Sequence, residues 1–320
     1  MAFPNPQGPL LGQTKVDKFL SQISLFYSNE TYIAEMVAPV LKVVQKTGIV
    51  PKYGKENLKV YVGQGLRLPG QRAAGFNYSV NTSDKYACFE HSFEKQVPWE
   101  LAANQDDPYD AKRDATKVAT DLILQNQEYA MAQFMSNASV LTNNTTLSAA
   151  NDKWSSPLTS DPIDDINTGI DAVRLKIARR PNSLTLSYPV FKTLKAHPKI
   201  RDAVKYTNGG QLSDADMGNF LKQFFNLKNI FVGEAVGDLT IEGQDPVLTE
   251  LWGKNAWLHY TTPSPSILTP TFAYTFFDLP RVVDTYPVIE EKSDYVRVSY
   301  SFDQHFCDVN AAYAIFAAIA

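Results

Sequence analysis

Cysteine, histidine and positive net charge are all scarce in this sequence, and each shortage excludes a class of protein. The 320 residues include two cysteines, Cys88 and Cys307, too few for a disulfide framework; we expect both to be buried thiols in a reducing compartment. The four histidines are dispersed and follow no zinc-binding spacing. The formal net charge of −4 argues against a protein that coats nucleic acid by bulk electrostatic attraction.

Long hydrophobic runs and catalytic motifs are lacking as well. The apolar run over 309–320 is too short to span a bilayer and predicts a buried terminal strand, and the N-terminus shows no signal-peptide pattern. The segment from Gly48 to Lys55 approaches a phosphate-binding loop, but Glu56 stands where serine or threonine would bind magnesium. We therefore expect no membrane association, no cofactor, no metal site and no catalytic residue.

The sequence does contain enough apolar residues for a large core, with 44% hydrophobic and 12% aromatic residues. A long helix is predicted from Asp107 to about Ser136, with Asp107 as the N-cap and Pro108 at the first helical position. A second helix starts at Pro162 and stops before Pro181. Strand-like segments follow over 183–187, 229–236 and 282–303. The predicted fold class is α+β, with an extended N-terminal half and a compact C-terminal half.

The segment over 46–95 is the feature most informative about function. The residues LKVYV (58–62) alternate as in a strand, a glycine-rich stretch (63–75) follows, and strand-like residues return over 76–80 and 86–95. A two-stranded ribbon is marginally stable in water when nothing covers its face. We therefore expect it to be covered, either as a lid over an active site or by a neighbouring copy of the protein.

Positive charge is concentrated along this ribbon. Between Lys42 and Arg72 the sequence has seven cations, and only Glu56 opposes them. A segment with charge of one sign favours a partner surface of the opposite sign. The ribbon is therefore predicted to lie against an acidic surface.

The order of these elements resembles that of the major capsid proteins of tailed bacteriophages, the Hong Kong 97-like (HK97-like) fold. The resemblance covers nearly the whole chain. It begins with IAEMVAPVLKVVQKTGIVPKYGKENL (33–58), which leads into the long loop, and continues with the acid-Pro start of the long helix. It is carried further by RPNSLTLSYPVFKTLKAHPKIRDAVKY (180–206), and by FVGEAV followed by ELWGKNAWLHY and PTFAYTFF.

The resemblance implies a division of the chain into domains. The implied parts are an N-terminal arm (1–30), a first part of the peripheral domain (31–137) with the extended loop 46–95 and the spine helix 107–136, an axial domain (138–277), a peripheral β-hairpin (278–303), and a C-terminal strand that returns to the axial domain (304–320).

The resemblance also implies a structural function. The protein would assemble with itself into pentamers and hexamers of an icosahedral head shell, which encloses double-stranded phage DNA without sequence-specific binding. Its location would be the virion, and the host cytoplasm during assembly. The implied partners are a scaffolding protein and a portal, with decoration proteins on the finished shell. No fused scaffolding segment is seen before the arm, so a separate scaffold or prior cleavage is expected.

Within this hypothesis, the cations of the extended loop dock onto an acidic surface of an adjacent subunit. The candidate contact residues are the cations Lys52, Lys55, Lys59, Arg67 and Arg72 and the acids Asp284, Glu290, Glu291 and Asp294. Two alternatives remain open. One is a shell of the encapsulin type that encloses cargo enzyme, and the other is a cytosolic enzyme with residues 46–95 as a lid.

Overall fold

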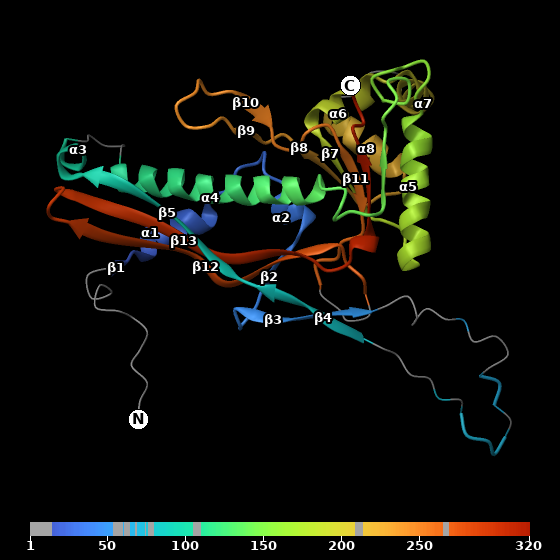
Figure 1. Cartoon of the computed structure of the whole chain (residues 1–320), viewed down its shortest axis with the longest axis horizontal. Coiled ribbons are helices and arrows are strands. Elements are labelled where there is room, and N and C mark those ends of the chain that lie inside the picture. Colours follow the sequence, from blue (N-terminus) through green and yellow to red (C-terminus); the bar gives the residue numbers. More distant parts are fainter. Residues whose placement is uncertain are drawn as a thin grey trace.

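The long helix α4 (Ala111–Met135) runs along most of the molecule and joins two separately packed bodies (Figure 1). This computed structural model describes residues 15–53, 60, 65–67, 69–73, 75, 80–104, 110–208, 214–264 and 269–320. The 25 residues of α4 span about 38 Å at 1.5 Å each. Helices and sheets are both abundant, which confirms the predicted α+β class.

The first body, at one end of α4, is built on a five-stranded sheet with the order β6-β14-β11-β7-β8. Its strands are β6 (Asn144–Thr146), β7 (Ser183–Ser187), β8 (Asn229–Gly233), β11 (Ala256–His259) and β14 (Ala312–Phe316). Its helices are α5 (Pro162–Ile177), α6 (Tyr188–Ala196), α7 (Pro198–Asn208) and α8 (Asp214–Phe224). Every residue of β7 is buried, so the prediction of a buried strand at 183–187 is confirmed.

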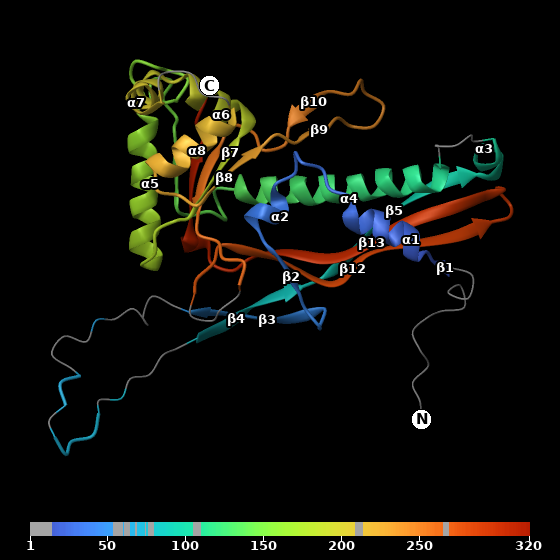
Figure 2. The same ribbon diagram turned by 180° about the vertical axis from the view of Figure 1, so that it is seen from behind.

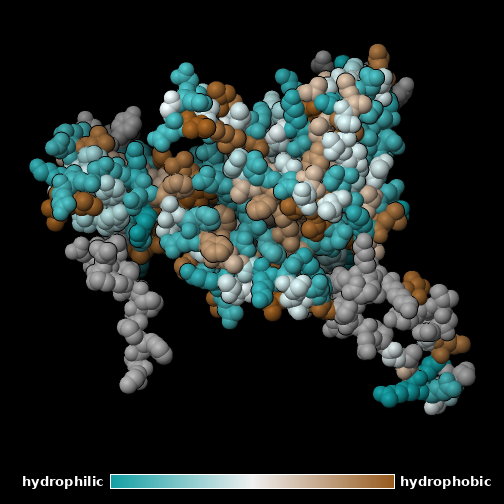
Figure 3. Space-filling view, viewed as in Figure 1, coloured by the Kyte–Doolittle hydropathy of each residue, from teal (hydrophilic) through white to brown (hydrophobic). Residues whose placement is uncertain are grey.

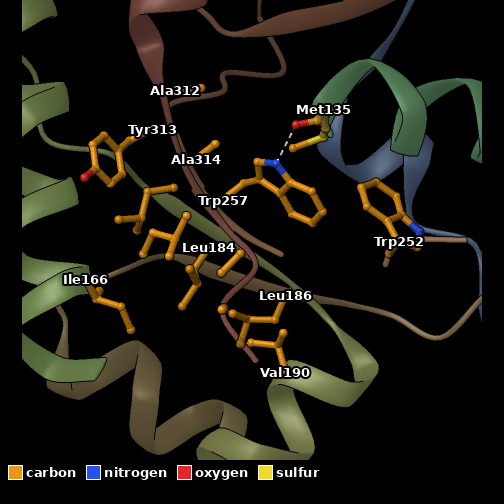
Figure 4. Packing of buried hydrophobic residues seen from close by; sticks show 14 of the residues in the cluster. Met135, Ile166, Leu184, Leu186, Val190, Trp252, Trp257, Ala312, Tyr313 and Ala314 are labelled. Carbon is orange, nitrogen blue, oxygen red and sulfur yellow. Dashed lines mark hydrogen bonds between the residues drawn. The ribbon is translucent and has the colours of Figure 1, made fainter. Parts of the chain in front are cut away.

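Tryptophans fill the core of this first body. Trp154, Trp252 and Trp257 are fully buried, and Figure 4 shows the indole Nε1 of Trp257 donating to the backbone oxygen of Met135 at 2.7 Å. Trp252 packs edge-on against Trp257, with ring centroids 5.5 Å apart. These contacts tie the C-terminal end of α4 to the sheet.

The second body is a twisted sheet with the order β1-β12-β13-β5, and β2 pairs in parallel with β12. Its strands are β1 (Lys15–Val16), β2 (Val40–Lys42), β5 (Phe89–Pro98), β12 (Ala273–Val288) and β13 (Ser293–Phe306). The helix α1 (Lys18–Phe26) and α4 pack on this sheet around Leu20, Ile123 and Val298. The short helix α3 (Trp99–Ala103) lies beside β5 and α4, whereas α2 (Ala34–Val37) and the 3-10 turn Val309–Ala311 pack into the core of the first body.

The start of the spine helix was predicted wrongly. The N-cap is Asp110, not Asp107, because its side chain accepts hydrogen bonds from the backbone N–H groups of Lys112 at 3.0 Å and Arg113 at 3.2 Å. Asp107 and Pro108 lie outside the described residues. The helix is therefore a few residues shorter than predicted and begins at Ala111.

The predicted hairpin over 282–303 is longer than its sequence pattern. The strand β12 continues through Pro280, and its pairing with β13 is irregular between Phe277 and Val282. Proline lacks the N–H that a regular ladder needs, and a bulge absorbs this loss without ending the strand. The residues before and after Pro280, which appear in the sequence as two separate segments, therefore form one strand, β12, of a single long hairpin.

Two small two-stranded sheets project from the rest of the molecule. One pairs β3 (Thr47–Tyr53) with β4 (Val80–Ala87), and the other pairs β9 (Val236–Asp238) with β10 (Leu248–Glu250). The strand β3 was not predicted. Of the strand predicted at 58–62, only Val60 is described, and it lies outside any strand. Figures 1 and 2 both show the two ribbons on opposite sides of α4.

Candidate assembly surfaces

The β3–β4 ribbon is anchored at its base by an apolar cluster. Val50 and Tyr86 of the ribbon pack with Tyr274 and Phe276 of β12, and the rings of Tyr86 and Phe276 stack with centroids 4.5 Å apart. The backbone N–H of Ala87 donates to Asp303 Oδ2 at 2.9 Å. The base of the ribbon is therefore held firmly by its own chain.

The described part of the loop beyond this base is exposed. Leu66 is 89% exposed, and Arg67 and Arg72 are both exposed. Lys52 differs from these two arginines because it forms an ion pair with Asp84 on the facing strand. Lys55 and Lys59 lie outside the described residues. Of the described candidate cations, Arg67 and Arg72 are therefore the two that face solvent.

The four predicted acids lie along the far part of the β12–β13 hairpin, and most of them contact their own chain. Asp284 forms an ion pair with Arg297 at 3.0 Å. Glu291 accepts a hydrogen bond from Gln96 at 3.2 Å and another from the hydroxyl of Tyr295. Glu290 and Glu291, both at the turn, are exposed.

Asp294 is the most strongly engaged of these acids. Its carboxylate accepts from Lys112 at 2.5 Å and from the indole N–H of Trp99 at 2.9 Å. Burial opposes ionisation of Asp294, but the hydrogen bonds from Lys112 and Trp99 outweigh it and lower the pKa of this carboxyl. Asp294 therefore fastens the start of α4 to the hairpin. The docking of loop cations onto these four acids stays a prediction.

A buried carboxylate ties the N-terminal segment and the spine helix into the core of the first body, and sequence reasoning missed it. Glu128 lies in the C-terminal half of α4 and is fully buried. Its oxygens accept from the backbone N–H of Ile33 at 3.0 Å, from that of Ala34 at 2.7 Å, and from the indole N–H of Trp252 at 2.6 Å. One side chain thus fixes the N-terminal segment, the spine helix and the tryptophan core to one another.

Burial sets the chemistry of the remaining titratable side chains in the core. It raises the pKa of Cys88 to about 11 and that of Cys307 to about 12, and both thiols are free and buried as predicted. It lowers the pKa of His259 to about 3, and this neutral imidazole contacts the hydroxyls of Thr185 and Thr261 at 2.9 Å each. These groups are part of the packing.

The described residues offer no obvious site for an ion or for a bilayer. No group of three or more histidine, cysteine, aspartate or glutamate side chains among them could hold a metal ion. The same part of the chain contains no helix with the length and apolar character needed to cross a membrane. What the geometry does offer is a set of projecting surfaces suited to contacts with other molecules.

Two relatives with assigned roles are phage proteins. The chain is 29% identical over 307 residues to the major capsid protein of Burkholderia phage BcepMu, covering 94% of this chain and 95% of that protein. It is 31% identical over 257 residues to the major capsid protein of Pseudomonas phage JBD67, covering 77% of each. This chain belongs to the phage major capsid proteins. No family model matches it.

Solved structures agree with this assignment. A phage-related protein from Bordetella bronchiseptica is 27% identical and superposes with a TM-score of 0.74, covering 95% of this chain and 97% of that one. The mature capsid of bacteriophage PhiM1 matches at 12% identity with a TM-score of 0.54, covering 91% and 88%. An encapsulin from Synechococcus elongatus matches at 7% identity with a TM-score of 0.51, covering 90% and 87%, which shows a shared fold alone.

The family assignment fixes the general role of this capsid protein. Its α+β architecture is the Hong Kong 97-like capsid fold, its role is structural and shell-forming, and its place is the virion capsid. A shell is built from many copies of one chain, so the projecting surfaces described above are candidates for contacts between copies.

Proposed function

We propose that this capsid protein assembles into pentamers and hexamers of an icosahedral head shell that encloses double-stranded phage DNA. The observation that carries the proposal is the β3–β4 ribbon together with the loop that joins its strands. The ribbon is anchored at its base, and the loop has exposed side chains at Leu66, Arg67 and Arg72. In the part of the chain that the structure describes, β3 and β4 pair only with each other. A neighbouring copy supplies the missing cover.

The strength of such a shell comes from repetition. Exposed ion pairs contribute about 0–1 kcal/mol each and weaken as salt screens them. Contacts of this size around a closed lattice hold a particle together, while a misplaced subunit still dissociates. The loop cations therefore set the register between subunits more than the strength of any one contact.

The net charge of −4 is more compatible with a shell that encloses DNA than with a protein that binds directly along it. A protein that neutralised DNA directly would need a cationic excess along the phosphates. In the proposed role the shell confines DNA without reading its sequence, and no catalytic step is required of the wall. Assembly takes place in the host cytoplasm with a scaffolding protein and a portal, and decoration proteins bind the completed shell.

The test of this function is assembly by the purified protein. We expect closed particles in negative-stain micrographs of the full chain, expressed alone or together with its scaffold. A sharp monomer at every concentration and salt would contradict the shell and favour the enzyme. Particles recovered from infected cells should contain DNA; particles filled with an enzyme cargo would instead support the encapsulin type.

Reversing the two exposed loop arginines should impair assembly. The variant Arg67→Glu/Arg72→Glu is expected to lower the yield of sedimenting particles by about tenfold, because a small loss at each contact is multiplied around the lattice. Arg67→Lys/Arg72→Lys keeps the charge and is the matched control. Yields equal to wild type for the reversed pair, with unchanged thermal unfolding, would rule out docking through these cations.

A further inference from the structure

The β9–β10 hairpin projects from the first body and lies over α4 (Figure 1). Its strands pair only with each other among the described strands, with Leu248 opposite Asp238 and Glu250 opposite Val236. The inner face approaches the molecule closely at Gly237, where an added Cβ would lie 3.0 Å from the Leu251 side chain. The outer face has no cover from the described chain, and a lone ribbon of this kind is marginally stable in water.

Apolar side chains are exposed on this hairpin. Leu248 on the outer face is 71% exposed, and Ile241 in the connecting turn is 77% exposed. Val236, which lies beside Leu248 on that face, is also exposed. Figure 3 shows hydrophobic surface over this hairpin. Apolar groups gathered on a projecting ribbon mark a surface that another molecule covers.

The charge on this hairpin has one sign. The segment 234–250 contains five acids and no lysine or arginine: Glu234, Asp238, Glu242, Asp245 and Glu250. The carboxylate of Asp238 is used inside the hairpin, where it accepts from Thr240 and Val247. Burial and the nearby charge of Glu234 raise the pKa of Glu250. A cation placed beside Glu234 and Glu250 would relieve their repulsion.

The extended loop carries the complementary chemistry. Its described tip pairs an exposed apolar side chain, Leu66, with the exposed cations Arg67 and Arg72. In both Figure 1 and Figure 2 the described part of this tip lies across the molecule from the β9–β10 hairpin, on the other side of α4. The two surfaces therefore lie apart from each other within one chain.

We propose that the β9–β10 hairpin is the surface that receives the extended-loop tip of a second copy of this chain. The inference rests on the proposed loop docking and names its acceptor. The rival acceptor, the β12–β13 hairpin, already uses Asp284, Glu291 and Asp294 to bind its own chain. At the rival turn Glu290 and Glu291 are also exposed, beside the exposed Ile289. The β9–β10 hairpin places Glu242 and Glu250 among a larger group of exposed apolar side chains: Val236, Leu239, Ile241, Val247 and Leu248.

Cysteine cross-linking of assembled particles distinguishes the two acceptors. In the variant Leu66→Cys/Ile241→Cys, mild oxidation should give a ladder of linked chains on a non-reducing gel. The matched control is Leu66→Cys/Ile289→Cys, because Ile289 beside Glu290 is also 77% exposed, at the turn of the β12–β13 hairpin. The native Cys88 and Cys307 are buried and should form no cross-links.

A ladder with Ile241→Cys but not with Ile289→Cys supports the inference. A ladder only with Ile289→Cys, or with neither, overturns it while leaving the shell function intact, provided that wild-type particles form. Absence of wild-type particles would instead count against the shell function itself.

A charge exchange provides a second, independent test. Glu242→Lys/Glu250→Lys should lower particle yield by about tenfold, as the loop reversal does. Combining it with Arg67→Glu/Arg72→Glu in one chain restores attraction between hairpin and loop, so yield should recover to near the wild-type value. If the combined variant assembles no better than either parent, while its thermal unfolding matches wild type, the hairpin does not receive the loop.

Discussion

Replacement of Glu128 by alanine is expected to lower the free energy of unfolding by about 3–5 kcal/mol, a large fraction of the stability of a typical domain. The substitution removes the carboxylate that accepts from three buried donors: the N–H groups of Ile33 and Ala34 and the indole of Trp252. Each buried donor left without a partner costs about 1–3 kcal/mol, and the lost side chain leaves a cavity in addition.

Glu128→Gln is the informative companion variant. It keeps the volume, but either orientation of the amide turns its NH₂ group toward a donor that the carboxylate accepted. We expect a loss of about 1–3 kcal/mol, smaller than that of Glu128→Ala. Both are measured by urea unfolding of unassembled subunits at one fixed concentration, since assembly would add to apparent stability. Losses under about 0.5 kcal/mol for both variants would show that Glu128 does not hold the N-terminal segment and the tryptophan core together.

The pH dependence of stability provides a separate check on Glu128. Burial raises the pKa of Glu128 above the ordinary value of a glutamate, although the hydrogen bonds from Ile33, Ala34 and Trp252 oppose the shift. The folded chain therefore holds this proton more tightly than the unfolded chain does. The linked stability is present below the unfolded pKa and is lost as the pH rises through the raised folded pKa. Wild type should lose stability in this window relative to Glu128→Gln; parallel curves would contradict the shift.

Local patterns in the sequence predicted the elements whose stability is local. The strand at 183–187 and the helix from Pro162 were placed correctly. A short strand-like run and an apolar stripe at helical spacing both indicate directly which residues are buried. The strand β3 was missed because Gly48 and Pro51 contradict a strand pattern. In the structure the β3–β4 pairing is irregular between Val50 and Lys52, around Pro51, so the missing N–H interrupts no regular ladder.

The contacts between segments far apart in the sequence were beyond sequence reasoning. In the sequence Glu128 looks like an ordinary polar residue of a helix. Its burial depends on contacts with Ile33 and Trp252, which are far from it along the chain. The acids on the β12–β13 hairpin were chosen for their charge, and the sequence gives no sign that Lys112 and Arg297 already contact two of them. The acidic run over 234–250 was visible in the sequence, but its isolation on a projecting ribbon was not.

Substitution of Gly233, at the end of β8, should destabilise the fold nearly as much as substitution of Glu128, because both residues contact Trp252. A Cβ added at Gly233 would lie 2.4 Å from Cδ1 and 2.5 Å from Cγ of Trp252. This indole ring cannot move away easily, because it is fully buried and its N–H is held by Glu128 at 2.6 Å. Gly233→Ala should therefore lower the free energy of unfolding by about 3 kcal/mol, at the upper end of the cost of overpacking a core.

The loss of chain entropy that alanine brings to the unfolded state recovers only about 0.4–1 kcal/mol of this cost. The control is Gly218→Ala in α8, where no atom lies within 4 Å of the added Cβ and a gain of up to about 1 kcal/mol is expected from helix propensity. Because Gly233→Ala acts by displacing Trp252 from Glu128, combining it with Glu128→Ala should cost less than the sum of the two single losses. Strict additivity in urea unfolding would show that the strain at Gly233 is relieved without disturbing the tryptophan, and that the carboxylate and the glycine stabilise the fold independently.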